Sequence, residues 1–258
     1  MRKVLVIMPG ADNDEALETR KQQAEMAEFG DDVEFHFRPI KVNSMFGSYH
    51  DWLLLDLAVF EAGLDAEEEG FDAVAIDTMS DGGLAYLRCV LDIPVIGAGQ
   101  AAYHTALLLG DKFSIVTMWD AWNGMYEKNL TDYDLMDHCA SIRAVDVVPD
   151  LDNYLGGKEE VVFPALVEVS MKCIEEDGAD VICIGSTSMF QAHDYMKEHL
   201  PVPVTNPGAL VYKMTETILD MGLTHSRRPY RKPDEVKRET LHSMLDAGYV
   251  SEHPEARV

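Results

Sequence analysis

The sequence predicts an α/β protein with two pseudo-symmetric Rossmann-like lobes, each built on a mainly parallel sheet, and a cleft between them. One reason is that strand-like and helix-like stretches alternate along the chain, which is typical of βαβ units. A second reason is an internal duplication. The stretch Gly70-Phe-Asp-Ala-Val-Ala-Ile-Asp-Thr78-Met-Ser80 resembles Gly178-Ala-Asp-Val-Ile-Cys-Ile-Gly-Ser186-Thr-Ser188, 108 residues further on (186 − 78). Two glycines that follow these stretches, Gly99 and Gly208, lie 109 residues apart (208 − 99).

The first half of the chain begins with an apolar run, Lys3–Met8, which Pro9-Gly10 ends as a strand. The acidic start at Asp14 predicts a helix, and an alternating apolar pattern then predicts the second strand. In this half we expect strands over 3–8, 33–38, 73–76 and 95–96, and helices over 14–29, 49–69, 81–90 and 100–109.

The second half repeats this order. We expect strands over 113–117, 141–147, 180–184 and 202–205, and helices over 121–132, 158–177, 189–199 and 208–221. Beyond these elements, the basic and proline-rich run Arg227–Pro233 is interpreted as a solvated connector, with an anion or partner site as the alternative, and one more helix is predicted over 234–247. Lobe one is expected to comprise residues 1–98 plus 208–258, and lobe two residues 99–207.

Composition narrows the function classes. The 258 residues carry a net charge of −25, which would repel a phosphate backbone, so neither nucleic acid nor a membrane is expected as a partner. No apolar stretch approaches the roughly 18 residues that span a bilayer. The first residues resemble a buried strand more than a signal peptide, so we expect a cytoplasmic protein. The four cysteines show no CxxC spacing and the histidines no HxxxH or HxH pair, so no metal site is expected.

Two loops of the duplicated stretches are the candidates for chemistry. Ligands of parallel sheets bind at the carboxyl ends of the strands, and Thr78 and Ser186 both follow a strand and precede a helix. Backbone N–H groups that open a helix can bind an anion, so we predict that the two loops hold one between them. The alternative is that Thr78, Ser80, Ser186 and Ser188 are only helix N-caps.

Two further loops are expected to ring the pocket. They are Pro9-Gly-Ala-Asp12 and Thr117-Met-Trp-Asp120, which end the first strand of each lobe. Their aspartates are interpreted either as helix caps or as polar pocket groups. Trp119 is interpreted either as a pocket wall or as packing between the lobes.

Taken together, these residues resemble the aspartate/glutamate/hydantoin racemase superfamily, and its hydantoin and allantoin racemase branch most closely. The resemblance covers Val4 to about Ser226. It depends on several motifs, namely Ala75-Ile-Asp-Thr-Met-Ser-Asp-Gly-Gly-Leu84, Pro94-Val-Ile-Gly-Ala-Gly-Gln-Ala-Ala-Tyr-His104, Leu109-Gly-Asp-Lys-Phe-Ser-Ile-Val-Thr117, Cys139-Ala-Ser-Ile-Arg143-Ala, Gly178-Ala-Asp…Ile-Gly-Ser186 and Pro203-Val-Thr-Asn-Pro207. It implies a two-lobed α/β enzyme without cofactors and commonly oligomeric. In that family one cysteine from each lobe faces the substrate α-carbon, one to remove its proton and one to deliver a proton to the opposite face.

The chain departs from this family at the reactive positions. Thr78 stands where the first cysteine would be and Ser186 where the second would be, and Gln100 replaces a glutamate that is usual in the family. A hydroxyl is a poor base near neutral pH, so a two-thiol mechanism is not available. The resemblance still implies an enzyme that acts at the carbon next to a carboxylate or imide carbonyl, as a racemase or isomerase. The alternatives are a lyase or decarboxylase, and a non-catalytic relative that binds a small anion or has a regulatory role.

The candidate site follows from these loops. The catalytic candidates are Thr78, Ser186, Asp77 and Asp12, and the substrate-binding candidates are Pro9, Met79, Ser80, Thr117, Trp119, Tyr126, Thr187 and Ser188. Strand alternation sends Asp77 to the face opposite Thr78, and Asp81 is expected to cap the following helix. A carboxylate base would need a pKa raised by burial. We expect a small anionic or cyclic-imide substrate, no cofactor, and a homo-oligomer.

Overall fold

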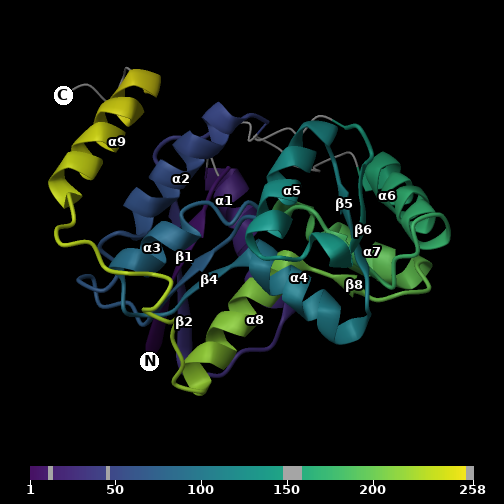
Figure 1. Ribbon diagram of the computed structural model, residues 1–258, viewed down its shortest axis with the longest axis horizontal. Helices are drawn as coiled ribbons and strands as arrows, with labels where there is room; N and C mark the ends of the chain where they lie inside the picture. Colours follow the sequence, from purple (N-terminus) through teal and green to yellow (C-terminus); the bar gives the residue numbers. More distant parts are fainter. Residues whose placement is uncertain (11–13, 45–46, 148–158, 254–258) are drawn as a thin grey trace.

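Two four-stranded parallel sheets form the centres of two lobes in the computed structural model, which describes residues 1–10, 14–44, 47–147 and 159–253 (Figure 1). The strand orders are β2-β1-β3-β4 and β6-β5-β7-β8, and every pairing is parallel. The strands are β1 (Arg2–Met8), β2 (Val33–Pro39), β3 (Ala73–Ile76), β4 (Val95–Gly97), β5 (Phe113–Thr117), β6 (Cys139–Ala144), β7 (Val181–Ile184) and β8 (Val204–Thr205). The two orders coincide when β1–β4 are matched with β5–β8, so the predicted α/β fold with two similar parallel sheets is confirmed.

Helices and 3₁₀ turns connect these strands. They are α1 (Asp14–Lys21), η1 (Gln22–Met26), α2 (Tyr49–Gly63), α3 (Leu84–Val90), α4 (Ala98–Leu109), η2 (Asp120–Trp122), α5 (Asn123–Asp132), η3 (Met136–His138), α6 (Glu159–Glu175), η4 (Thr187–Met189), α7 (Ala192–His199), α8 (Pro207–Asp220) and α9 (Arg238–Glu252). Several predicted bounds were wrong, and the largest differences concern four elements. The helix expected over 14–29 becomes 3₁₀ after Lys21, the one over 49–69 ends at Gly63, the strand over 141–147 lies at 139–144, and the last helix lies at 238–252. Periodicity places an element, but local packing decides where it ends.

Two helices cross between the lobes. α4 follows β4 of the first sheet but buries Ala102, Tyr103 and Ala106 in the core of the second. α8 follows β8 of the second sheet but buries Val211 and Tyr212 in the core of the first. The two helices lie next to each other at the centre of Figure 1. On this packing we propose that lobe one comprises residues 1–98 with 208–258, and lobe two residues 99–207.

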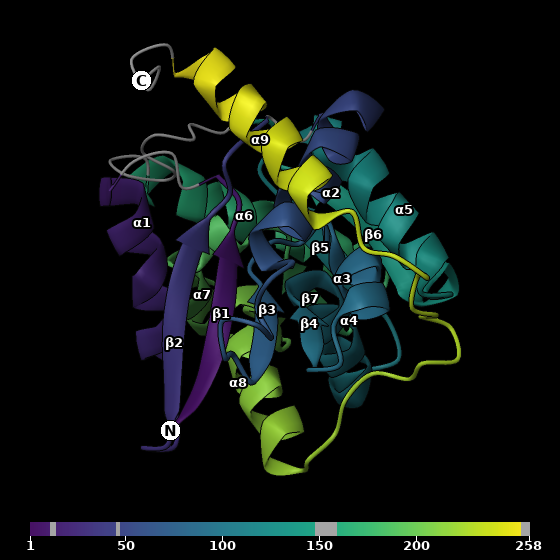
Figure 2. The same ribbon diagram turned by 90° about the vertical axis from the view of Figure 1, so that its left-hand side faces the viewer.

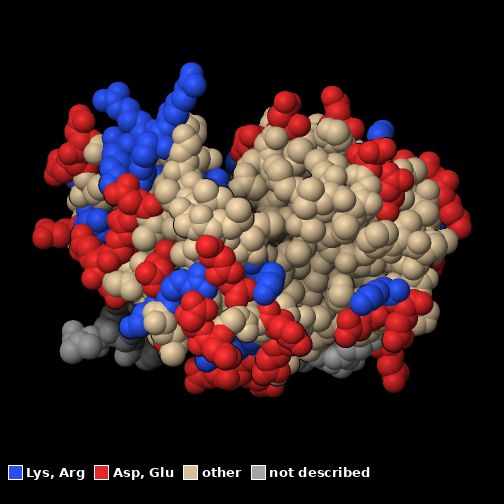
Figure 3. All heavy atoms as spheres, turned by 90° about the horizontal axis from the view of Figure 1, so that it is seen from below, with Lys and Arg blue, Asp and Glu red and all other residues tan. Residues whose placement is uncertain are grey.

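The basic segment after α8 runs along the outside of lobe one and leads to α9 (Figure 2). Arg227 donates to the carbonyls of Arg88 and Leu91 and pairs with Asp92, and Lys232 also pairs with Asp92, at 2.5 Å. These two residues of the predicted solvated connector are therefore anchored to lobe one by polar contacts. Figure 3 shows a group of Lys and Arg at the upper left of a face on which Asp and Glu otherwise prevail. Within the described residues, no helix is long and apolar enough to cross a membrane.

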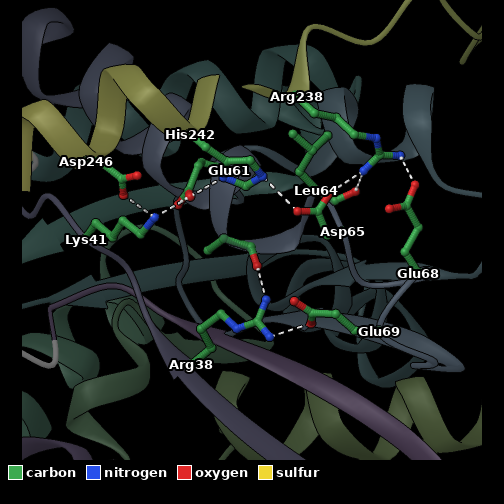
Figure 4. Close-up of polar contacts among 11 residues, drawn as sticks. Arg38, Lys41, Glu61, Leu64, Asp65, Glu68, Glu69, Arg238, His242 and Asp246 are labelled. Atoms are coloured by element: carbon green, nitrogen blue, oxygen red, sulfur yellow. Dashed lines mark hydrogen bonds and ion pairs between the residues drawn. The ribbon is translucent and has the colours of Figure 1, made fainter. Parts of the chain in front are cut away.

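Charged groups fasten α9 to α2 (Figure 4). Lys41 lies 2.7 Å from both Glu61 of α2 and Asp246 of α9. His242 of α9 lies between two carboxylates, with Nδ1 2.6 Å from Glu61 Oε1 and Nε2 2.7 Å from Asp65 Oδ2. Both ring nitrogens can donate only in the imidazolium form, so this geometry requires a charged histidine. The hydrogen bonds that His242 donates to Glu61 and, with a smaller effect, to Asp65 accordingly raise the pKa of His242.

Docking of α9 is therefore expected to weaken as the pH rises. A histidine whose pKa is raised by folding contributes stability that is complete below its unfolded value, near 6.5, and is lost as the pH passes the raised folded value. Hydrogen-exchange mass spectrometry at about pH 6 and about pH 9, corrected for the intrinsic exchange rate, should show lower protection of α9 at the higher pH. His242→Gln should remove most of this difference, and His253→Gln should not, since the described hydrogen bond of the His253 ring stays within α9 and its C-cap, to the Tyr249 carbonyl. Equal pH dependence in both variants would contradict the assignment.

Candidate active site between the two lobes

The loops after β3 and β7 have the same alternation of burial. In the first loop Asp77 and Met79 are buried while Thr78 and Ser80 are half-exposed. In the second loop Gly185 and Thr187 are buried while Ser186 and Ser188 are half-exposed. Each loop therefore presents two hydroxyl side chains, two residues apart, at the carboxyl end of its sheet.

The two hydroxyl pairs also share their geometry. Thr78 Oγ1 lies 3.1 Å from Ser80 Oγ, and Ser186 Oγ lies 2.8 Å from Ser188 Oγ. The later residue of each pair donates its backbone N–H to the earlier hydroxyl, at 3.4 Å and 3.3 Å. The N-cap alternative applies to Ser186, which caps η4, but Gly83 and not Thr78 precedes α3.

Backbone donors accompany these hydroxyls. Within the described parts of the chain, no acceptor takes the N–H of Thr78, Met79, Ser186 or Thr187. Successive N–H groups at the end of a parallel strand form a site for an anion or a developing oxyanion. The loops therefore offer two matching sets of donors.

A buried ion pair supports the first loop from below. Arg20 is 3% exposed and its Nη2 lies 2.8 Å from Asp77 Oδ2, while Asp77 is fully buried. Gln23 and Tyr212 donate to the same oxygen, at 3.1 Å and 3.0 Å. These contacts are at odds with the prediction of Asp77 as a base. Its side chain lies beneath the loop without solvent exposure, on the side away from Thr78, as strand alternation requires.

Tyr126 of α5 has the corresponding place in lobe two. Its hydroxyl lies 2.8 Å from Thr117 Oγ1 and donates to the carbonyl of Gly185. All three residues are buried, and burial raises the pKa of Tyr126, so the phenol stays protonated and can donate. A Cβ at Gly185 would lie 2.8 Å from Thr117 Cβ, so this close approach requires glycine. Thr117 and Tyr126, predicted to bind substrate, instead pack under the second loop.

The remaining candidate residues, Pro9, Trp119 and Asp12, differ in their surroundings. Pro9 is buried and its carbonyl accepts from Arg20 at 3.3 Å. Trp119 is half-buried, and its ring lies 3.3 Å from the position of a Cβ on Gly47, which lies between β2 and α2 of lobe one, so Trp119 packs between the lobes. Asp12 lies outside the described residues.

Asp81 joins the lobes next to the first hydroxyl pair. The sequence predicts that Asp81 caps the helix that follows it, and this prediction is wrong for its side chain. The carboxylate instead accepts from the N–H groups of Gly99 and Gln100 at the start of α4, at 2.9 Å and 2.7 Å. Tyr133 of lobe two donates to it at 2.6 Å. Burial raises the pKa of Asp81 to about 6. A cavity of about 370 Å³ lies here, lined by Ser80 and Asp81 together with residues of α5.

The thiols lie elsewhere. Among the described residues, none of the four cysteines is on either loop, and burial raises the pKa of both Cys139 and Cys183 to about 12. Neither is a thiolate near neutral pH. The described residues also contain no group of three His, Cys, Asp or Glu side chains that would hold a metal ion.

The duplicated sheets and the matching donor loops define a two-lobed α/β protein with a candidate site that draws a loop from each half. Residues 15–215 match the family described as Asp/Glu/hydantoin racemase. Over 203 residues the chain is 30% identical to a hydantoin racemase of Pseudomonas sp. (strain NS671), covering 78% of this chain and 79% of that protein. The chain therefore belongs to the Asp/Glu/hydantoin racemase family.

Solved structures show the same fold. An allantoin racemase from Klebsiella pneumoniae has a TM-score of 0.81 at 25% identity, over 92% of this chain and 95% of that one. An unliganded arylmalonate decarboxylase has a TM-score of 0.59 at 14% identity, over 89% of this chain and 100% of that one, which is a likeness of fold alone. The two-lobed racemase fold is thus shown by structure as well as by sequence.

Proposed function

We propose that the protein is a cofactor-independent racemase of small carbonyl compounds, acting on the carbon next to an imide or carboxylate carbonyl. The observation that carries this proposal is the matched pair of loops, each with two half-exposed hydroxyls and two N–H donors for which the described residues supply no acceptor. Relatives named hydantoin racemase and allantoin racemase support a cyclic imide as the substrate class.

In this proposal the loops bind and polarise the substrate. The N–H groups of one loop stabilise the negative charge that develops on the carbonyl oxygen as the neighbouring carbon loses its proton. Thr78 and Ser186 face the reacting carbon from the two lobes, and their partners Ser80 and Ser188 are close enough to relay a proton. A hydroxyl is a weak base, so the exchange rate is expected to rise with pH across the neutral range.

Proton exchange in D2O tests the proposal. The protein is incubated with 5-substituted hydantoins, allantoin, amino acids and substituted malonates, and the α-proton is followed by NMR. Exchange with loss of optical activity and no other product supports a racemase. Loss of substrate to a new product supports a lyase or decarboxylase instead, and binding without either supports the non-catalytic alternative.

Variants of the two loops test whether Thr78 and Ser186 take part in the reaction. Thr78→Ala and Ser186→Ala are each expected to lower the exchange rate more than about tenfold, a loss of roughly 1.4 kcal/mol in transition-state stabilisation. Ser141→Ala is the matched control, because its hydroxyl forms a similar pair with Ser114, at 2.8 Å, on the strands of lobe two. Unchanged rates in both loop variants would remove Thr78 and Ser186 from the mechanism.

We also propose that the protein works as a cytoplasmic homo-oligomer. Leu108 and Leu109 at the end of α4 are 81% and 52% exposed, which leaves apolar surface for a second copy.

A further inference from the structure

Each loop is hydrogen-bonded to the opposite lobe through the residue that lies between its two hydroxyl residues, and we call this contact a tie. These residues are Met79 and Thr187, which correspond in the duplication (187 − 79 = 108). Asn129 of lobe two donates from Nδ2 to the Met79 carbonyl at 2.9 Å. Arg20 of lobe one donates from Nη2 to Thr187 Oγ1 at 2.7 Å. In the first contact lobe two donates to the loop of lobe one, and in the second lobe one donates to the loop of lobe two. Each loop is therefore held by a side chain of the other lobe.

The tie to Thr187 depends on its hydroxyl. Thr187 Oγ1 accepts from Arg20 and donates to the carbonyl of Asp77, at 3.1 Å, so one atom contacts two residues of lobe one. Arg20 also donates to that carbonyl, at 2.7 Å. The Asp77 carbonyl directly precedes Thr78, and Thr187 directly follows Ser186. This contact therefore fixes the distance between the two reactive positions.

The hydrogen bond to Met79 is buried, like the one to Thr187. Asn129 is 3% exposed and Met79 is 2% exposed, so no bulk water competes for the bond. An amide that donates to a buried carbonyl cannot be replaced by a carboxylate of the same size without repulsion between two acceptors.

We propose that Arg20, Asn129 and Thr187 are positioning residues that hold the two hydroxyl pairs at the separation that one substrate molecule needs to be gripped from both faces. This inference deepens the proposed function and depends on it for its catalytic consequence. The reason is geometric. The spacing of groups on two separate sheets depends on the noncovalent contacts between the lobes, and misplacement by about 1 Å can slow a reaction about a hundredfold.

The test begins without any assay of activity. Thr187→Val keeps the shape of the side chain and removes both hydrogen bonds, Thr187→Ser restores the hydroxyl, and Thr215→Val is the matched control. Thr215 is also buried, but among the described residues its hydroxyl bonds only to Val211 O within α8, at 2.7 Å. In hydrogen-exchange mass spectrometry, Thr187→Val is expected to speed exchange at least about tenfold at the hydrogen-bonded amides of residues 77–82 of the other lobe, which are those of Asp77, Ser80, Asp81 and Gly82. Thr187→Ser and Thr215→Val should leave those residues unchanged.

Kinetics then separate positioning from substrate binding. With 5-methylhydantoin in D2O, Thr187→Val and Asn129→Asp should lower kcat for proton exchange about tenfold or more and change KM by less than about threefold. Thr187→Ser should recover most of the wild-type kcat. Absence of exchange by the wild-type protein would overturn the proposed function, while the cross-lobe hydrogen-exchange result would still decide whether the tie exists. Unchanged exchange of residues 77–82 in Thr187→Val, or an equal change in Thr215→Val, would overturn the inference.

Discussion

Replacement of Arg20 by methionine is expected to lower the free energy of unfolding by about 3–5 kcal/mol. The side chain is buried and forms an ion pair at 2.8 Å with Asp77, which is also buried. Removing the guanidinium leaves a carboxylate without its counter-ion in a low-dielectric environment, and that desolvation dominates the loss. Chemical denaturation followed by circular dichroism measures the effect, with the midpoint and the slope fitted separately.

Two further variants make this expectation specific. Adding Asp77→Asn to Arg20→Met should recover part of the stability, because the double variant no longer buries an unpaired charge. Arg143→Met is the surface control, since Arg143 pairs with Asp177 and Glu176 at a position where it is 31% exposed. Such a pair contributes about 0–1 kcal/mol. An effect of Arg20→Met no larger than that of Arg143→Met would show that the buried pair does not stabilise the folded protein more than a surface pair does.

The second large effect is a dependence of stability on pH that comes from Asp81. Burial raises its pKa to about 6 in the folded protein, whereas an unfolded aspartate titrates near 3.9. Below about pH 4 both states bind the proton. Between the two values the folded state holds more protons than the unfolded state, so stability falls as the pH rises. The shift of about two units corresponds to roughly 3 kcal/mol lost between about pH 4 and about pH 7.

Comparison with Asp81→Asn isolates this contribution, because asparagine does not titrate. The stability of the wild-type protein minus that of the variant should fall by roughly 3 kcal/mol from about pH 4 to about pH 7. Asp32→Asn is the control with the opposite sign, since the hydrogen bond with Arg2 lowers the pKa of Asp32. There the difference should rise slightly with pH, because a depressed carboxyl stabilises the folded state above its unfolded pKa. A pH-independent difference for Asp81→Asn would contradict the raised pKa.

Much of the candidate site could be predicted from the repeat alone. Parallel strands put their carboxyl ends at one edge, so Thr78 and Ser186 were placed correctly after β3 and β7 by the duplication. Alternation also placed the Asp77 side chain opposite Thr78, and the structure shows it held there by Arg20. These predictions succeeded because they depend on periodicity along the backbone, which is a local property.

The supporting residues could not be predicted in this way. Arg20 and Thr187 are 167 residues apart, and Asn129 and Met79 are 50 apart, so no local pattern pairs them. A weak signal did exist. The residues before the helices, Pro9 and Thr117, correspond in the duplication (117 − 9 = 108), and this could have drawn attention to the helices that follow them, which carry Arg20 and Tyr126.

The amino-acid sequence by itself determined the alternating α/β pattern, the twofold repeat, and the placement of hydroxyl residues, Thr78 and Ser186, in matching loops. Only the tertiary structure decided which hydroxyls remain accessible, which carbonyls they flank, and which charged groups lie beneath them. The physical reason is that strand and helix periodicity is encoded in neighbouring residues. The desolvation and pairing of Arg20, Asp77 and Asp81, in contrast, exist only once two distant halves have closed around them.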